Sequence, residues 1–425
     1  MHDVVVVGAG SAGCVLAERL SRDPDRSVLL LERGPGWPYA EVTDLYHLPV
    51  GADAATVGRT VSYPVSPPDL AVVRGHGIGG SAAVNGAYFL RWHRDDFVSW
   101  EHPIADIEAA YAEVESVMSA SPFADDELPD AARAFEQWWG ALLPTRPVGE
   151  RWPAVGVNRI HSNSIRDAAG GRRVTTAEAF LRPALGRPNL TVRTSTTVTA
   201  LESKGDRVLG VRCDTESIRC DEVVLCAGTL GTAAILFASG LATGPLRVVE
   251  HREMLVHYRL RHSPGRPTPL LPTVAHTASG CEIRCYGGDF ADYIDGVPPL
   301  GPAIGVAAMS PGTPGTLVWD GATLTVDLGS APDLPARLAP ELDQVQDMLN
   351  SGDFRGIIEP GSVRVDPVVR TSQHASGSLP MGDRTDRFGA LDGVHGLRIV
   401  DGSILPPGGR SGPHATTVMV AALSS

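Results

Sequence analysis

The chain has 425 residues, 43% of them hydrophobic and 20% charged, as in an ordinary soluble globular protein. Its formal net charge of −13 argues against nucleic-acid binding, which needs a basic face for the phosphates. No apolar run approaches the ~20 residues of a membrane span, and a strand begins too early for a signal peptide. Six cysteines without CxxC spacing predict reduced structural thiols and no metal site, so we expect a cytoplasmic protein.

The first 34 residues predict a strand–helix–strand unit. Residues 3–10 form a β-branched run that ends in glycine, as a buried parallel strand does. Residues 11–23 carry apolar side chains at helical spacing, and 27–34 read as a second strand. The unit predicts a parallel α/β sheet.

The turn between this strand and helix predicts a dinucleotide site. Gly8, Gly10 and Gly13 give G-x-G-x-x-G, in which the glycines allow a tight turn, close approach of a pyrophosphate and close helix packing. Ser11 and Ala12 open the helix, whose N-terminus favours phosphate. Glu32, at the end of the second strand, can accept hydrogen bonds from ribose hydroxyls. The motif alone does not separate NAD from FAD.

A second glycine segment, 72–100, follows a long irregular stretch, 35–69. A nicotinamide dehydrogenase would continue with regular βα units here. The segment instead resembles the first signature of the glucose–methanol–choline (GMC) flavoprotein oxidoreductases, G-G-[ST]-x-x-x-N-G after an arginine. The resemblance implies FAD, with Val84 at the position of a tethering histidine and hence non-covalent binding. It implies cofactor roles for Arg74, Gly79, Gly80, Ser81, Asn85 and Gly86.

The middle of the chain resembles the second GMC signature. The predicted strand 221–228 leads into a helix at 229–241, although Ala233 and Ala242 replace a usual proline and glycine. Residues 190–201 read as two short strands. By resemblance, Val198 lies where family members bind the adenine through backbone atoms.

The pattern of apolar and polar residues changes in the segment 246–370. Alternating runs at 254–260, 281–288, 303–309 and 323–329 predict antiparallel strands with one polar face, and 339–353 predicts a covering helix. The GMC substrate domain is similar in build. We expect the helical stretch 104–118 and the residues to about 150 to join it.

Two histidines near the end of the chain predict the chemistry, because imidazole can take a proton from an alcohol at neutral pH. His374 lies in 372–382, which resembles the family segment that carries the active-site base. By resemblance, Asp401 and Gly402 return to the ribityl–pyrophosphate region. His76 and His93 flank the flavin loop, and His251 follows Glu250 where the family has an Asp-His pair. We interpret these three as structural histidines.

The closing helix, 411–423, aligns with the family in two frames. One puts His414 in the second catalytic position. The other, N-P-x-x-T, puts Gly412 there and displaces His414. We favour the first frame because only it supplies a functional side chain.

The sequence thus predicts an α/β protein with a Rossmann-like FAD-binding domain and an inserted α+β substrate domain on an antiparallel sheet. We expect FAD-dependent oxidation of a small-molecule alcohol, with His374 as base, His414 as hydrogen-bonding partner and a separate electron acceptor. The ending 410–416 resembles mycofactocin-associated members, which favours a dehydrogenase over an oxidase. A lyase of the hydroxynitrile type and a nicotinamide-dependent reductase are the alternatives.

The expected domain boundaries are 1–103, 151–245 and 371–425 for the FAD domain, 104–150 for the joining helices and 246–370 for the substrate domain.

Overall fold

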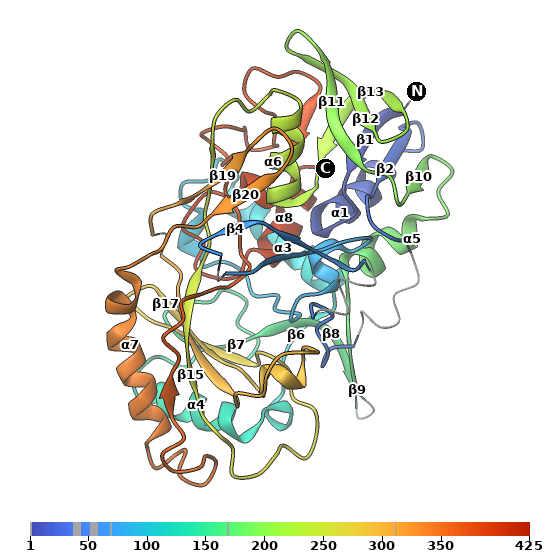
Figure 1. Cartoon of the computed structure of the whole chain (residues 1–425). Coiled ribbons are helices and arrows are strands. Elements are labelled where there is room, and N and C mark those ends of the chain that lie inside the picture. Colours follow the sequence, from blue (N-terminus) through green and yellow to red (C-terminus); the bar gives the residue numbers. More distant parts are fainter. Residues whose placement is uncertain (1, 37–43, 52–57, 69, 168–169, 311) are drawn as a thin grey trace.

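The structure, a computed structural model, describes every residue except 1, 37–43, 52–57, 69, 168–169 and 311. Figure 1 shows two lobes, one above the other, with both chain termini in the upper lobe. The upper lobe is built on a parallel sheet and the lower lobe on an antiparallel one. Each lobe has its own cluster of buried apolar side chains.

The parallel sheet confirms the predicted α/β fold. Its strand order is β10–β2–β1–β13–β23, and every neighbouring pair is parallel. β1 and β2 are almost continuously apolar because helices and loops cover both faces. The strands are β1 (His2–Val7), β2 (Val28–Leu31), β10 (Leu190–Arg193), β13 (Ser217–Leu225) and β23 (Leu397–Ile399), and β11 (Val198–Lys204) and β12 (Arg207–Cys213) extend β13 as an antiparallel meander.

Helices α1 (Ser11–Leu20), α8 (His414–Leu423) and α3 (Ile104–Val117) pack side by side in the upper lobe, and α6 (Gly228–Ala238) lies beside β11. We expected residues 104–118 to join the substrate domain, but α3 packs on α8 instead. The reason is its stripe of Ile107, Tyr111 and Val114, which belongs to the upper core. The short α5 (Arg182–Ala184) completes this lobe.

The lower lobe is an antiparallel sheet of order β21–β15–β18–β17–β16–β7, with β22 paired to β15. Helix α7 (Leu334–Leu349) packs on β15 and β18, and α4 (Asp130–Gly140) packs on β7, β16 and β17. α7 starts five residues before the predicted helix because Leu334 and Leu338 extend its apolar stripe toward Leu342. The strands are β7 (Gly156–Arg159), β15 (Arg252–His257), β16 (Thr273–His276), β17 (Cys281–Cys285), β18 (Ala303–Ala308), β21 (Arg364–Val365) and β22 (Arg370–Thr371).

Smaller sheets join the lobes. The predicted strand 323–329 contains β20 (Leu324–Asp327), but β20 pairs with β19 (Gly315–Trp319) and β4 (Val65–Ser66), outside the large antiparallel sheet. Its apolar residues pack in the upper core. The remaining strands are β14 (Leu246–Val248), β3 (Thr60–Tyr63), β5 (Val72–Gly75), β6 (Ala120–Pro122), β8 (His161–Asp167) and β9 (Gly170–Arg173).

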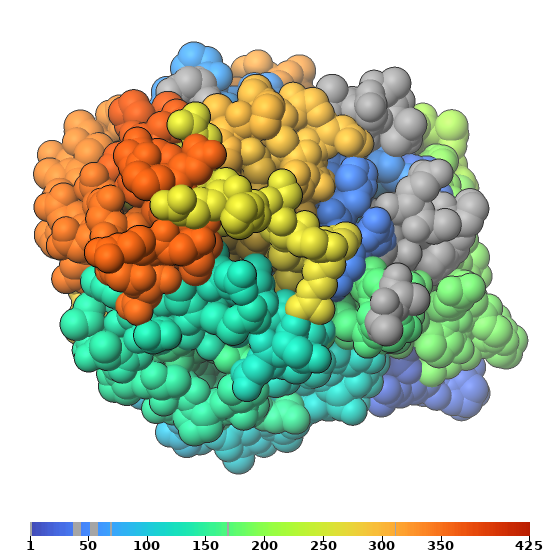
Figure 2. All heavy atoms as spheres, turned by 90° about the horizontal axis from the view of Figure 1, so that it is seen from below, coloured from blue at the N-terminus to red at the C-terminus, as the bar shows by residue number. Residues whose placement is uncertain are grey.

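Strand pairing crosses the domain boundaries that we expected. β7 lies before residue 246 yet pairs with β16 of the lower sheet, whereas β14 and β19 lie after it yet contribute to the upper core. Figure 2 shows the underside, where teal, yellow and orange segments distant in sequence form one face. The insertion is therefore interwoven with the FAD-side lobe.

All six cysteines are buried and free. No helix among the described residues is long and apolar enough to cross a membrane.

Candidate active site

The two glycine segments meet at one point of the upper lobe. A Cβ on Gly80 would lie 2.8 Å from the Cα of Gly10, and Gly80 has a left-handed φ of +50°. The Gly79 backbone N–H donates to the Ala9 carbonyl at 2.7 Å. A Cβ on Gly13 would lie 1.8 Å from the Gly8 carbonyl oxygen, so helix α1 can pack this closely only with glycine. These contacts hold a backbone cradle over the N-terminus of α1.

Glu32 directly follows β2 and lies at the same place, close to the strand end that the sequence predicts. Its carboxylate accepts the backbone N–H groups of Ala9 and Gly34, both at 2.8 Å, and that of Gly77 at 3.2 Å. It therefore ties three loops together beside the cradle. A ribose hydroxyl could therefore donate only to a lone pair of the Glu32 carboxylate that these three bonds leave free.

The rest of the flavin loop is held by local contacts. Ser81 Oγ accepts the Gly75 backbone N–H at 3.1 Å, and Asn85 Oδ1 accepts that of Ala87 at 3.0 Å. A Cβ on Gly86 would lie 2.8 Å from Leu270 of the lower lobe. The loop is thus clamped between the lobes.

Arg74 joins this loop to the segment of His374. Its Nη1 donates to Gln373 Oε1 at 2.8 Å, and Gln373 also accepts the Val73 backbone N–H at 3.0 Å. Gln373 adopts a left-handed φ of +63°, a strained conformation that non-glycine residues hold when surrounding contacts fix it. The residue before His374 is therefore fixed against the flavin loop.

Asp401 and Gly402 lie on the other side, beside the N-terminus of α6. Asp401 accepts Thr232 Oγ1 at 2.6 Å and the Ser403 backbone N–H at 2.8 Å, and burial raises the pKa of its carboxyl. A Cβ on Gly402 would lie 2.9 Å from Thr229 Oγ1. Val198, the buried first residue of β11, pairs with Cys213.

His374 is brought to the site by two antiparallel segments. Backbone bonds join Val249 to Ser376 and Ser372 to His251, so the residues between them face each other. The His374 backbone N–H donates to Glu250 Oε1 at 2.7 Å, and its Nδ1 lies 2.9 Å from His251 Nδ1. The two rings are perpendicular, with centroids 5.1 Å apart. Both backbone and ring of His374 are held.

His374 and His414 are not brought together by any contact between described residues. Gly412 instead faces His374, because its Cβ would lie 3.3 Å from His374 Nε2 and 3.3 Å from Tyr88 Cε1. His414 turns to the cofactor cradle, where its Nδ1 lies 3.3 Å from Ser11 Oγ and its ring stands edge-on to Phe89. Its Nε2 is buried and has no hydrogen-bond partner among the described residues.

A buried polar network on β17 covers the site from the lower lobe. Glu282 accepts Tyr88 Oη at 2.7 Å, His276 Nε2 at 3.0 Å and Arg284 Nε at 2.7 Å. Arg284 also donates to Glu253, the second buried carboxylate, at 3.0 Å, and its positive charge offsets part of the charge of Glu253. With one guanidinium and two carboxylates, the network has one net negative charge when its histidine is neutral.

Burial sets the protonation of these groups. It lowers the pKa of His374 well below the usual range, and it lowers the pKa of His251 and of His414 to about 4. Burial opposes ionisation of Glu282, but Arg284, His276 and Tyr88 outweigh it and lower its pKa. At neutral pH the site therefore has neutral imidazoles beside a charged carboxylate.

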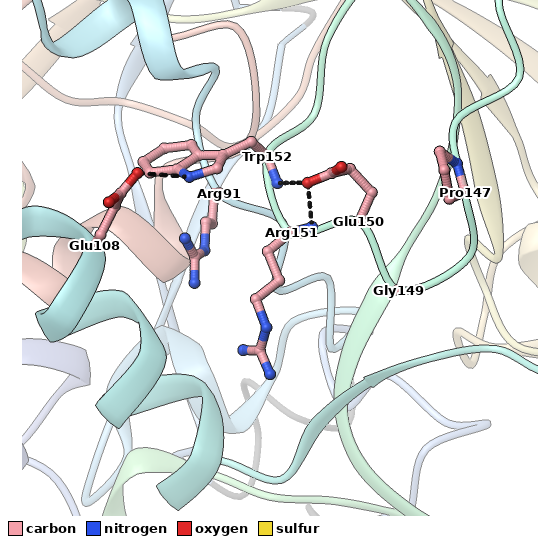
Figure 3. A pocket seen from close by; sticks show the side chains of 7 residues that line it. All are labelled: Arg91, Glu108, Pro147, Gly149, Glu150, Arg151 and Trp152. Atoms are coloured by element: carbon pink, nitrogen blue, oxygen red, sulfur yellow. Dashed lines mark hydrogen bonds between the residues drawn. The ribbon is translucent and has the colours of Figure 1, made fainter.

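Two hollows lie near this region. A groove of about 580 Å³ is lined by Arg91, Glu108, Arg151 and Trp152, among others (Figure 3). The Arg91 guanidinium lies over the rings of Tyr111 and Trp152, and Tyr111 Oη lies 2.7 Å from Thr416 Oγ1 of α8. These contacts hold α3 to α8. The second hollow, about 210 Å³, is lined by His276 and Met309, which contact the β17 network.

The cradle fits FAD. Gly10 and Gly80 leave backbone where side chains would block a pyrophosphate, and Ser11 and the unpartnered Nε2 of His414 offer polar groups at the N-termini of two helices. No cluster of three or more metal-ligating side chains occurs in the described part of the chain, so its residues offer no metal centre.

Sequence reasoning missed the β17 network and interpreted His251 as a structural histidine. The alternation of Glu282 and Arg284 with Ile283 predicts a strand with one polar face, and such a face on an antiparallel sheet commonly meets water. In the structure all five residues of β17 are buried. The signal that could have found the network is the presence of both charge signs on one strand face.

Comparison with known proteins gives one family. Residues 2–250 and 358–421 match the family models described as GMC oxidoreductase. A GMC-type oxidoreductase from the thcA 5′ region of Rhodococcus erythropolis is 32% identical over 100% of this chain and 97% of its own length. An alcohol dehydrogenase [acceptor] of Pseudomonas putida is 27% identical over 60% of this chain and 51% of that protein. The crystal structure of pyridoxine 4-oxidase from Mesorbium loti superposes with a TM-score of 0.82 at 23% identity, covering 100% and 98% of the two chains.

Proposed function

Because the chain belongs to the GMC oxidoreductase family, we propose that it oxidises an alcohol to a carbonyl with non-covalently bound FAD. The observation that carries the proposal is the hydrogen bonding of His374. Its backbone and Nδ1 are held by Glu250 and His251, and its Nε2 makes no hydrogen bond among the described residues. A fixed, neutral imidazole with one open nitrogen suits a general base.

The chain's own residues handle the proton. His374 Nε2 would accept the proton of the substrate hydroxyl, and the low pKa of His374 keeps the imidazole neutral at neutral pH. When bound, FAD would accept the hydride from the carbinol carbon. The Gln373–Arg74 contact holds the base against the flavin loop while this occurs.

The second catalytic position follows the Gly412 frame in this proposal. The support is that Gly412, and not His414, lies against His374 Nε2. His414 would then bind the cofactor together with Ser11 at the start of α1. In this proposal His414 does not have the role we expected, a hydrogen bond to the developing alkoxide, and another group makes that bond.

Non-covalent binding is supported by Val84, which offers no nucleophile at the position before Asn85. A dehydrogenase that passes electrons to a separate acceptor is supported by the name of the Pseudomonas relative. The ending 410–416 supports a mycofactocin-linked acceptor. Reoxidation of the reduced flavin by air and by a dye separates an oxidase from a dehydrogenase.

Anaerobic flavin reduction across a panel of primary and secondary alcohols tests the function. We expect at least one alcohol to bleach the flavin of the wild type, and His374→Ala to slow this by roughly 10²–10⁴ with FAD still bound. His374→Gln, which keeps polarity without a base, should be equally slow. An unchanged rate in His374→Ala would remove the base assignment. A flavin that no alcohol bleaches, with cleavage of a cyanohydrin, would identify the lyase instead.

A further inference from the structure

The contact between His374 and His251 restricts which nitrogen carries each proton. Their Nδ1 atoms are 2.9 Å apart, so one must donate and the other accept. His251 is 6% exposed, and a hydrogen bond to the Gly409 backbone favours its protonated form. Because Nδ1 of His251 faces His374, we assign this bond to Nε2, which would donate to the Gly409 carbonyl. Nδ1 of His251 is therefore the acceptor, and His374 is protonated on Nδ1. The lone pair of His374 is left on Nε2.

The opposite arrangement would disable the base. If His251 donated from Nδ1, His374 would be protonated on Nε2, the nitrogen that faces Gly412, and could not accept a proton there. The Gly409 carbonyl opposes this, because a neutral His251 that donates from Nδ1 has no proton left for it.

The helix that would supply a second side chain does not supply one here. α8 begins at His414, whose ring points to Ser11, and Gly412 leaves no side chain beside His374. The imidazole that touches His374 comes from the strand entry before β15 and lies at Nδ1, whereas Gly412 faces Nε2.

We propose that His251 is the positioning residue for His374: it holds the ring from the Nδ1 side and fixes the Nδ1–H tautomer. The proposal rests on the proposed role of His374. During turnover the substrate proton moves to His374 Nε2, while the Nδ1 proton stays between the two histidines and His251 keeps its own proton on Gly409. No proton leaves the pair until product is released.

The surroundings of His374 agree with an imidazolium that forms only during reaction. Burial, His251, Arg284 and Arg74 oppose its charge, whereas Glu282 favours it. Glu250 faces it from the same segment as His251 and accepts its backbone N–H. His251 is the one of these groups that touches the ring nitrogen.

Three substitutions of His251 separate positioning from packing. His251→Asn places an acceptor oxygen near the Nδ1 position, and His251→Phe keeps a ring without an acceptor. We expect the phenylalanine variant to reduce its flavin about 10–100-fold more slowly at unchanged substrate affinity, with the asparagine variant recovering most of the rate. His251→Asp should raise the apparent pKa of flavin reduction by about one unit or more above that of His251→Asn.

His257→Phe is the matched control. His257 lies on β15, is equally buried and bonds the Gly301 carbonyl at 3.1 Å, away from His374. Its variant should lose stability but not rate. Equal slowing of the asparagine and phenylalanine variants would reduce His251 to packing and overturn the proposal. If the phenylalanine variant does not hold FAD, equal pKa values for the asparagine and aspartate variants would overturn it.

Imidazole ¹⁵N spectra give a readout without turnover. In the FAD-bound protein at neutral pH, we expect His374 to carry its proton on Nδ1 and His251 on Nε2. The reverse tautomers would overturn the inference. Because these spectra need no substrate, they separate its failure from failure of the proposed alcohol oxidation.

Discussion

Gly80 combines two reasons for being glycine. Its φ of +50° is left-handed, and a Cβ would lie 2.8 Å from Gly10 Cα. The first reason is local and costs about 1–3 kcal/mol for another residue. The second is a contact between two signature loops that are 70 residues apart, and only this one concerns the cofactor cradle.

Replacing Gly80 by Ala should separate the loops and weaken FAD binding by tenfold or more, about 1.4 kcal/mol. Gly205→Ala is the control, since Gly205 has a φ of +64° and no neighbour within 4 Å of its Cβ position. Both variants should unfold at lower temperature, but only Gly80→Ala should show reduced affinity in a flavin fluorescence titration. Equal affinities would place the cofactor away from the cradle.

β17 shows why the surroundings of a correctly predicted strand can still differ from expectation. Its alternation gave the strand and its apolar face, Ile283 and Cys285, correctly. Whether the opposite face meets water depends on what packs against it, and that is Tyr88, from a loop 194 residues earlier. Local periodicity carries no such information.

Arg284→Met tests the buried network on this element. The change leaves Glu282 and Glu253 without their shared cation in a buried site, which should cost about 3–5 kcal/mol of unfolding free energy. Arg370→Met removes an exposed partner of Asp366 and should cost less than about 1 kcal/mol. Chemical denaturation measures both. A loss of similar size in the two variants would mean that the network is not sealed from water.

Most elements of the site could be predicted because each signature is short and continuous. The glycine turns, Glu32 and the segment of His374 needed only the residues around them. The histidine pair could not be predicted, because its two members are 123 residues apart and meet only through the Val249–Ser376 register. The identity of the residue opposite His374 depended on one alignment frame, which sequence spacing left open.

The two lobes are joined by more crossings than an insertion in sequence suggests. β7 enters the lower sheet from the FAD-side part of the chain, and β19 and β20 return to the upper core. Domain boundaries placed where the pattern of apolar and polar residues changes cannot show such exchanges. A strand can have the same alternation in either sheet. Since the lobes share strands, we expect them to unfold together, and groups buried in both contribute to one transition.

Acid should therefore destabilise the whole molecule from about pH 6.5 downward. The pKa values of His251 and His414 fall to about 4, that of His93 to about 2 and that of His374 well below normal, all chiefly through burial. Unfolding restores a pKa of about 6.5, so below this pH the unfolded chain binds more protons and stability falls as pH falls. Each such histidine contributes about 1.4 kcal/mol per pH unit. The raised pKa values of Glu250 and Asp401 act in the opposite direction, because the folded protein binds these two protons more tightly than the unfolded chain does. Denaturation at saturating FAD between pH 7 and 5 should show this slope, and His414→Gln should reduce it by one histidine's share. His395→Gln, whose side chain is 70% exposed, should leave the slope unchanged. A slope that does not respond to His414→Gln would mean that its ring is already charged in the folded protein.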